Sequence, residues 1–526
     1  MRMLRRISFW ALALLFAAGT IFWSLYIPHR PLDLYRAIPA QATFVSAHHN
    51  LAGRWGDLAT NPVTRSLLLS LGFDEDDLDS AADGADAGPW LKRLAGQETL
   101  FAYVPRLGPA GETAWVFASW LGSGSQRLRW MLYWSKGKGI KHAFDRAGHH
   151  IWMVDPRVSK SADVISFAFV EGMVIGTISK RAATTASVLD SFDGTYPSFF
   201  RTRNPDLMPL PDTNTPDRGW FTWREKSGIY SAPRGFFDIH HLGPNSINAD
   251  VELPWTKGEL AKDAEPAVAH DDLEACWKDG PVAVAFLRSG LLQRLAGDSR
   301  MTLLRETLGL ATDVGAGEIA LAAMAGDLSG RFKGIKMPTI LAAVPVEGDA
   351  APETNVVARM DALNAMNRWG LVPQELVVGS QRVYAVESTA DTPYARSPKD
   401  ELLAYTVSGS WLVFASNVEG LTNLLARPAP AGAREWNVQN GGDDASLWLD
   451  LDDGAKAFRV AITAYALKLA AEDAEKSQPM RQRLNEAKAW IDAIAPMKSL
   501  RATVRVKTDR IAVHLDAGAV NRSNGP

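Results

Sequence analysis

The arrangement of apolar and polar positions along the chain produces one pattern twice, at residues 167–179 and 404–416. Each copy is an apolar run interrupted once by a polar residue and a glycine, which is typical of two strands joined by a tight turn. A short helical pattern follows each copy, at 185–189 and 420–425. We therefore expect a tandem repeat built from antiparallel hairpins and short helices.

The segments around the two hairpins also match. In the first copy, strand patterns lie at 43–47, 98–104, 113–121 and 149–154, and a helical pattern from Leu51 to Gly72 is interrupted at Pro62. In the second copy, strand patterns lie at 282–287, 317–323, 338–345 and 381–386, and helical patterns at 291–308 and 355–369. Partial copies are expected at 219–253 and at 445–517, the latter with a helical pair at 455–474 and 480–494. The predicted fold is α+β: an N-terminal transmembrane helix, then tandem repeats of antiparallel sheets with helices packed on one face.

Two segments of the first copy allow more than one interpretation. The acidic stretch 73–79 lacks the central glycine and the terminal glutamate of a calcium loop, so we interpret it as a solvated loop. The basic and aromatic stretch 127–134 has the composition of a site for single-stranded nucleic acid or lipid headgroups. Because leucine and tryptophan occupy every second position from Leu128 to Trp134, we instead predict a half-buried strand with a basic edge.

An uncharged apolar run occupies residues 9–27. At 1.5 Å per residue, a helix of this length spans about 28 Å, close to the hydrocarbon thickness of a bilayer. Arginines at positions 2, 5 and 6 precede the run and Pro28 ends it, so the N-terminus is expected in the cytoplasm. The alternative is a cleaved signal peptide with Ala17 and Gly19 at its cleavage site. We expect a single-pass protein of the bacterial inner membrane, with the bulk of the chain periplasmic or extracytoplasmic.

These patterns divide the 526 residues into six parts, in keeping with about two to four domains for this length. The parts are a cytoplasmic tip and transmembrane anchor at 1–27, a tether at 28–40, a first α+β repeat at 41–192, Pro-rich linkers with a partial β repeat at 193–280, a second α+β repeat at 281–428, and a C-terminal partial repeat with a helical hairpin and a β-hairpin at 429–526.

Composition mainly excludes classes of function. A formal net charge of −3 provides no long-range attraction to nucleic acid, which we do not expect as a partner. Cys276 is the only cysteine, which excludes an intramolecular disulfide and a cysteine-based zinc site within one chain.

The eighteen tryptophans are interpreted as core anchors, with an aromatic contact surface as the alternative. Since no nucleophile elbow, phosphate loop or zincin motif occurs, we expect no catalytic residue and no cofactor.

Three histidine pairs are the one unusual feature of the sequence: His48-His49, His149-His150 and His240-His241. Each pair lies in or beside a predicted strand, where neighbouring residues point to opposite faces, so a pair offers one imidazole per face. Three imidazoles from three strands are able to bind zinc or copper. We interpret the pairs as strand-edge histidines with local hydrogen bonds, and keep a metal site as the remote alternative.

Several segments carry a family resemblance. They are 38–45, 50–55 and 61–72 in the first copy, and 317–322, 338–344 and 404–416 in the second. Together with the N-terminal membrane segment, they resemble the DUF3352 family of bacterial membrane-anchored proteins over most of residues 38–427. The resemblance implies a bacterial envelope protein with an outward β-rich repeat region, and it carries over no catalytic or binding residue.

The leading hypothesis is a non-enzymatic envelope protein, anchored in the membrane through residues 9–27, whose outward repeat domain binds a protein partner. The alternative is binding of a lipid or another hydrophobic ligand, which requires Leu, Trp and Phe side chains exposed along one sheet face. The remote alternative is a metal-dependent hydrolase that uses the histidine pairs. It requires one histidine of each pair to lie within about 5 Å of the others.

Overall fold

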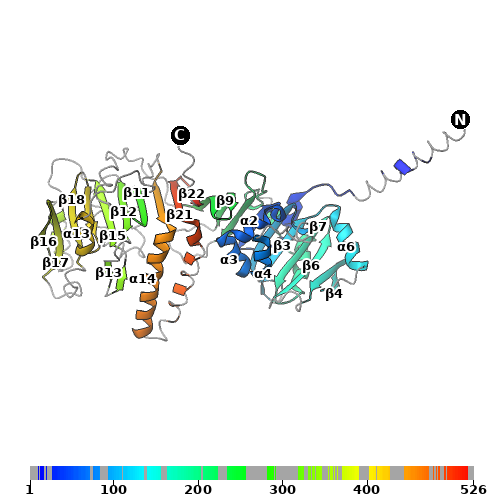
Figure 1. Cartoon of the computed structure of the whole chain (residues 1–526). Coiled ribbons are helices and arrows are strands. Elements are labelled where there is room, and N and C mark those ends of the chain that lie inside the picture. Colours follow the sequence, from blue (N-terminus) through cyan, green and yellow to red (C-terminus); the bar gives the residue numbers. More distant parts are fainter. Residues whose placement is uncertain are drawn as a thin grey trace. The chain divides into compact units, whose positions relative to one another are not determined.

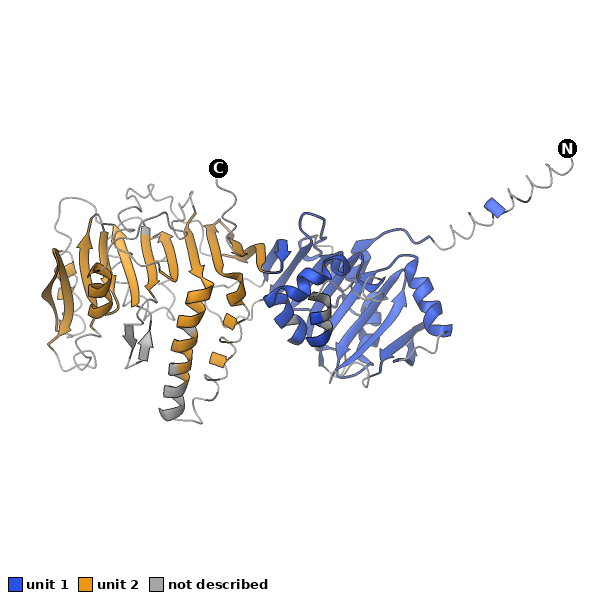
Figure 2. Ribbon diagram, in the orientation of Figure 1, with its two compact units in different colours: residues 1–222, 234–244 blue, residues 223–233, 245–526 orange. Residues whose placement is uncertain are grey.

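The chain forms two compact units, residues 1–222 with 234–244 and residues 223–233 with 245–526 (Figures 1 and 2). Apart from single positions, the computed structural model describes residues 26–70, 75–82, 93–108, 111–134, 139–155, 163–202, 205–222, 234–255, 281–288, 318–324, 330–332, 335–337, 339–345, 370–389, 402–409, 411–426, 443–472 and 494–518.

The first unit is built on an antiparallel sheet. In spatial order its strands are β9 (Arg234–Gly243), β8 (Asp217–Thr222), β1 (Phe44–His49), β2 (Glu98–Leu107), β3 (Glu112–Trp120), β7 (Met173–Ser179), β6 (Val164–Val170), β5 (His149–Val154) and β4 (Ile140–Arg146). Its helical elements are η1 (Pro31–Ala37), η2 (Leu51–Arg54), α2 (Trp55–Thr60), α3 (Pro62–Ser70), α4 (Glu75–Ala82), α6 (Gly124–Trp134), α8 (Thr184–Phe192), η3 (Phe199–Thr202) and η4 (Pro205–Leu207).

The second unit is also built on an antiparallel sheet. In spatial order its strands are β10 (Ser246–Pro254), β22 (Arg510–Gly518), β21 (Ser499–Val506), β20 (Ala445–Asp450), β11 (Ala283–Arg288), β12 (Glu318–Met324), β15 (Thr339–Pro345), β19 (Trp411–Ala415), β18 (Ala404–Ser408), β17 (Gln381–Ser388) and β16 (Leu371–Val378). The remaining elements are a separate β13 (Gly330–Phe332) and β14 (Ile335–Met337) hairpin, α13 (Val418–Ala426), α14 (Leu451–Glu472) and η8 (Ala495–Met497).

The two sheets have the same strand order, and equivalent strands pair at equivalent positions at their centre. The order β1-β2-β3-β7-β6-β5-β4 in the first unit corresponds to β11-β12-β15-β19-β18-β17-β16 in the second. Val45 of β1 pairs with Trp220 of β8, and Val284 of β11 pairs with Trp448 of β20, so the two tryptophans occupy equivalent positions. The architecture is α+β, mainly antiparallel sheet with some helices, as the sequence predicts.

The two hairpins that define the repeated pattern are confirmed. β6 and β7 are joined by Glu171 and Gly172, whose φ angles are 47° and 88°. Two consecutive residues with positive φ form the turn whose twist matches that of antiparallel strands. β18 and β19 pair around Gly409, which has a φ of 57°. The helices expected after the hairpins are α8 and α13.

The segments expected as separate partial copies instead complete the two sheets. β8 and β9 overlap the expected copy at 219–253, and β8 pairs with β1. β20, β21 and β22 lie in the expected copy at 445–517, and β20 pairs with β11. Without these strands, β1 and β11 would each expose a row of unpaired backbone N–H and C=O groups. Because those backbone groups need hydrogen-bond partners, a strand distant in sequence pairs with each of β1 and β11.

Helices lie on both faces of the first sheet, which corrects the expectation that they pack on one face. Ile151 and Trp152 are neighbours on β5 and therefore point to opposite faces. Ile151 belongs to the apolar cluster that includes Val188 of α8. Trp152 belongs to a different cluster, which includes Leu128 and Leu132 of α6. Strands that are apolar on both faces need cover on both faces.

The stretch 127–134 was expected as a strand and belongs to helix α6, so that prediction is wrong. The two leucines that suggested alternation, Leu128 and Leu132, are four residues apart and are the buried positions. Side chains four residues apart share one face of a helix as well as one face of a strand. The alternation therefore did not distinguish the two structures, and Trp130 and Trp134 are exposed.

The acidic stretch 73–79 was expected as a loop, but residues 75–79 belong to helix α4. Leu78 is fully buried in a small cluster with Ala59, and Arg65 of α3 pairs with Asp79 at 2.6 Å. One buried apolar side chain and an ion pair hold this acidic helix against its neighbours. The predicted start of α3 at Pro62 is confirmed, since the Asn61 side chain accepts hydrogen bonds from the backbone at the helix start.

Several predictions fall wholly or mostly on residues that the structure does not describe. They are the anchor at 9–27, the helices at 291–308, 355–369 and 480–494, and the position of Cys276. Of the N-terminal run, the described residues between Trp10 and Phe16 are helical and exposed, with 66% to 78% of each side chain accessible. Among the described residues, none of the helices combines the length and the apolar character needed to cross a bilayer.

Candidate functional site

The β4–β5 hairpin at the edge of the first sheet brings chemically active side chains together. Its turn consists of Ala147 and Gly148, whose φ angles of 51° and 79° give the tight two-residue loop that antiparallel strands favour. The turn fixes the register of the two strands, and Asp145 of β4 lies directly opposite His150 of β5. Directly opposed residues point to the same face of a sheet. The hairpin therefore holds a carboxylate beside an imidazole.

A β-bulge in β4 adds a second imidazole to this pair. The register with β5 shifts between His142 and Phe144. In a regular strand, residues three apart such as His142 and Asp145 point to opposite faces and do not meet. A bulge inserts one extra residue and re-aims the side chain beside it. Here the bulge brings His142 to the face that carries Asp145 and His150.

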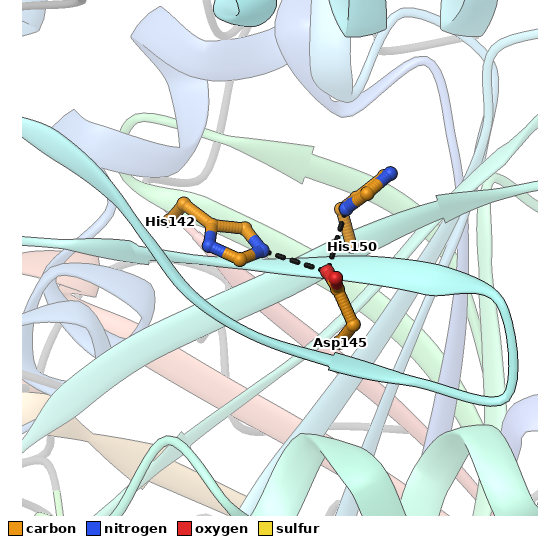
Figure 3. Close-up of side chains that lie close together, drawn as sticks. All are labelled: His142, Asp145 and His150. Carbon is orange, nitrogen blue, oxygen red and sulfur yellow. Dashed lines mark hydrogen bonds and ion pairs between the residues drawn. The ribbon is translucent and has the colours of Figure 1, made fainter.

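The three side chains converge on one carboxylate oxygen (Figure 3). Oδ1 of Asp145 accepts hydrogen bonds from Nε2 of His142 at 2.7 Å and from Nδ1 of His150 at 2.6 Å. One potential ligand atom from each residue lies within 4.8 Å of the other two. The pKa of the Asp145 carboxyl is lowered, chiefly by the hydrogen bond from His142 and further by His150. The carboxylate is thus ionised and faces two nitrogen atoms.

Aromatic rings border the cluster and orient the imidazoles. The ring of Tyr133, from α6, meets His150 edge-on at a centroid distance of 5.1 Å. Trp152 lies 5.7 Å from the ring of His142 and also contacts Tyr133. His142 and Asp145 are exposed and His150 is half-buried, so water reaches the cluster. Two nitrogen ligands, one oxygen ligand and access to solvent suit a divalent transition-metal ion.

The three histidine pairs singled out in the sequence do not meet in the structure. Among the described residues, no cluster of three metal-ligand side chains takes one histidine from each pair. His48 and His49 lie on β1, and His149 and His150 lie on β5, with β2, β3, β7 and β6 between them. Five strand spacings correspond to about 24 Å. A single metal centre shared by the three pairs is therefore not formed.

Most of these histidines instead make the local contacts that were expected. His48 donates to Asp217 at 2.7 Å and contacts Ser46 at 2.9 Å. The other contacts are His49 with Glu98 at 3.8 Å, His149 with Asp193 at 4.0 Å and His240 with Thr215 at 3.5 Å. His241 is exposed on β9. Within the part of the chain that the structure describes, His150 is the one member of the three pairs that belongs to a cluster with metal-binding geometry, and its partners were not predicted.

His142 and Asp145 were not predicted as ligands, because no strand was expected at 140–146. A signal was present in the spacing His142, Asp145 and His150 around an Ala-Gly turn. Strict alternation, however, places His142 on the wrong face, since only the bulge restores it. The bulge has no separate signature in this sequence that we could identify.

A second polar cluster lies in the interior of the first unit. The carboxylate of Asp217, on β8, is 3% exposed and accepts two hydrogen bonds from Arg54, at 2.6 and 2.8 Å. His48 completes the cluster. Burial alone would raise the pKa of Asp217, but the hydrogen bonds and charges of Arg54 and His48 outweigh it and lower the pKa to about 2. Every charge is paired, so this cluster offers no open ligand position.

Helix α6 presents an exposed aromatic and basic surface. Leu128 and Leu132 face the sheet, whereas Trp134 is 89% exposed. The other exposed side chains of this surface are Arg127, Arg129, Trp130 and Tyr133. Among the described tryptophans, the exposed ones are Trp10, Trp130 and Trp134, so the interpretation of tryptophans as core anchors holds for the described strands and not for α6.

Comparisons with known proteins give no relative: no family model matches the chain, and no curated protein or solved structure matches it either. The resemblance to the DUF3352 family stays a prediction from the residues quoted above.

Proposed function

We propose that this chain is a membrane-anchored protein of the bacterial envelope whose outward β-rich part binds a protein partner through the open edge of the second sheet. The edge strand β16 carries this proposal. Among the described residues, β16 pairs with β17 on one side and with no strand on the other. Exposed backbone donors and acceptors on an edge strand are a template for a strand of another protein.

The edge strand β16 exposes two valines and carries fewer charged side chains than its counterpart β4. Val377 is 72% exposed and Val372 is 40% exposed. β16 also carries Pro373 and an exposed Glu375, whereas the equivalent edge strand of the first sheet, β4, carries exposed Lys141, Asp145 and Arg146. Charged side chains are a common device against edge-to-edge pairing, and exposed valines favour it. The two sheets share a strand order, so the difference is a property of these edges and not of the fold.

The N-terminal run supports the anchor. Its described apolar side chains, such as Leu14 and Phe16, are exposed, and an uncharged apolar run of this length is long enough to span a bilayer as a helix. Ile27 at the end of the run packs against the core of the first unit, close enough that a Cβ atom at Gly172 would lie 2.8 Å from its side chain. That Cβ atom at Gly172 would also lie 3.5 Å from the carbonyl oxygen of Gly122. Gly122 is two residues before the start of α6. An anchor at residues 9–27 would therefore leave the membrane beside α6.

This position gives α6 a second role within the proposal, contact with lipid headgroups. Tryptophan and tyrosine favour the membrane interface, and arginine pairs with anionic headgroups. Binding of a lipid inside a sheet groove is less well supported. No described strand has an exposed Leu, Trp or Phe, which are the side chains that such a groove requires.

Replacing Val377 with lysine is expected to reduce recovery of the partner about tenfold. The reason is that an unpaired charge buried at an interface costs about 1.4 kcal/mol or more. Recovery is measured after cross-linking of the full-length protein in its own membrane. Mass spectrometry identifies the partner. Ile340→Lys is the matched control, because Ile340 is exposed on β15 within the same sheet. Equal recovery from wild type and Val377→Lys would contradict the assignment of β16. Failure of wild type to capture any protein would contradict the proposed function itself.

A further inference from the structure

The edge hairpin of the first sheet supports an inference that is independent of the anchor and of β16. We propose that His142, Asp145 and His150 bind one divalent transition-metal ion, with Zn²⁺ and Cu²⁺ as the ions that fit the donor set. Imidazole nitrogen suits both ions, and a carboxylate oxygen is a common third ligand. Water completes the coordination, because the cluster lies open to solvent.

The distances require only a small adjustment. Ligand atoms around a tetrahedral zinc ion lie about 2.0–2.2 Å from the metal, which places them about 3.3 Å from one another. The two nitrogen atoms now lie 2.7 and 2.6 Å from the same Asp145 oxygen. An ion replaces the two hydrogen bonds when these contacts lengthen by less than about 1 Å. His142 and Asp145 are exposed, so rotation of their side chains supplies that change.

The backbone is built to produce this cluster. The turn at Ala147 and Gly148 sets Asp145 opposite His150. The bulge between His142 and Phe144 turns the third ligand, His142, toward the other two. Bulges occur frequently next to functional sites, where they re-aim a side chain. Without the bulge, the strand would hold a two-residue His–Asp pair. The irregularity therefore converts an ordinary ion pair into a three-ligand site.

The second sheet provides an internal comparison. Its edge hairpin, β16–β17, turns at Gly379, and its strands pair without a register shift. The pair Val377 and Arg382 occupies the position of Asp145 and His150 relative to the turn. The second hairpin thus shares the topology but has neither the bulge nor the ligands. The cluster is a feature of the first hairpin and does not follow from the fold.

Isothermal titration of the metal-free, full-length protein in detergent with ZnCl₂ tests the proposal. We expect binding of one ion, with an affinity that falls at least about tenfold, or 1.4 kcal/mol, in His142→Ala and in His150→Ala. Asp145→Asn keeps the shape of the side chain, removes its charge and should weaken binding in the same way. All three positions lie on an edge hairpin, and circular dichroism confirms that each variant is folded before titration.

A matched control separates this cluster from ordinary surface histidines. His514 donates to Asp250 at 2.7 Å, and both side chains are about half exposed, but among the described residues no third metal ligand joins them. His514→Ala should therefore leave the affinity unchanged. With Cu²⁺, paramagnetic resonance should show coupling to two nitrogen ligands in the wild type and to one in His150→Ala. The proposal is overturned if no ion binds below about 100 µM, if the ligand variants bind like the wild type, or if His514→Ala lowers the affinity as much as they do.

Discussion

Asp217→Ala is expected to lower the free energy of unfolding of the first unit by about 3 kcal/mol, because it removes the buried carboxylate that pairs with the half-buried Arg54 and His48 side chains. Asp217 accepts two hydrogen bonds from the Arg54 guanidinium and one from His48, and only 3% of its side chain is exposed. The loss should show as faster hydrogen exchange of the β1 and β8 amides in the full-length protein.

The neighbouring strand contains a matched control. Asp238, on β9, also forms a bidentate ion pair with an arginine, Arg218, at 2.8 and 2.9 Å. That pair is about one-third exposed, so Asp238→Ala should cost no more than about 1 kcal/mol. An Asp217→Ala variant whose exchange matches that of Asp238→Ala would show that the buried cluster does not stabilise the sheet.

The same carboxylate should make the first unit sensitive to acid. The pKa of Asp217 is about 2 in the folded chain and 3.8 when unperturbed, so the unfolded state binds the proton more tightly. The stabilisation is fully present above about pH 5 and is lost progressively as the pH falls from about 5 to 1, with a total of roughly 2–3 kcal/mol. Hydrogen exchange of β1 between pH 5 and pH 2.5 should show this loss in wild type and less of it in Asp217→Asn. Parallel pH dependence in both proteins would assign the acid sensitivity to other groups.

Trp220→Ala is expected to lower the free energy of unfolding of the first unit by about 3–5 kcal/mol, because deletion of a large buried side chain leaves a cavity. Trp220 is fully buried, its ring meets Phe199 edge-on at 4.9 Å, and its Nε1 donates to the carbonyl oxygen of Leu207 at 3.1 Å. The substitution also leaves that carbonyl without its donor, which adds to the cost. Denaturant unfolding followed by hydrogen exchange measures the change.

Trp134 provides the control for this substitution. It is 89% exposed on α6, and surface replacements of this kind change stability by about 0.5 kcal/mol or less. Equal destabilisation by Trp134→Ala and Trp220→Ala would contradict the burial of β8 at the centre of the first unit. Because Trp448 is the register equivalent of Trp220, Trp448→Ala should destabilise the second unit and leave the exchange of β1 unchanged.

The sequence by itself determined the elements whose signals are local. The glycine after Glu171 specifies the hairpin turn, because glycine adopts a positive φ at little cost in free energy. Asn61 and Pro62 specify the start of α3, because a capping side chain and a preset φ act within one turn of helix. The repetition of the hairpin pattern likewise depends only on residues that are adjacent in the chain.

Tertiary structure alone decided the rest. Leu128 and Leu132 satisfy the period of a strand and of a helix, and packing against Trp152 selected the helix. β8 joins β1 because buried backbone groups must be paired, and the sequence does not state which distant strand supplies the partners. The candidate metal site arises in the same way, since His142 reaches Asp145 only through a bulge defined by the register with the neighbouring strand. Contacts across strands, unlike turns and caps, are set by the whole sheet.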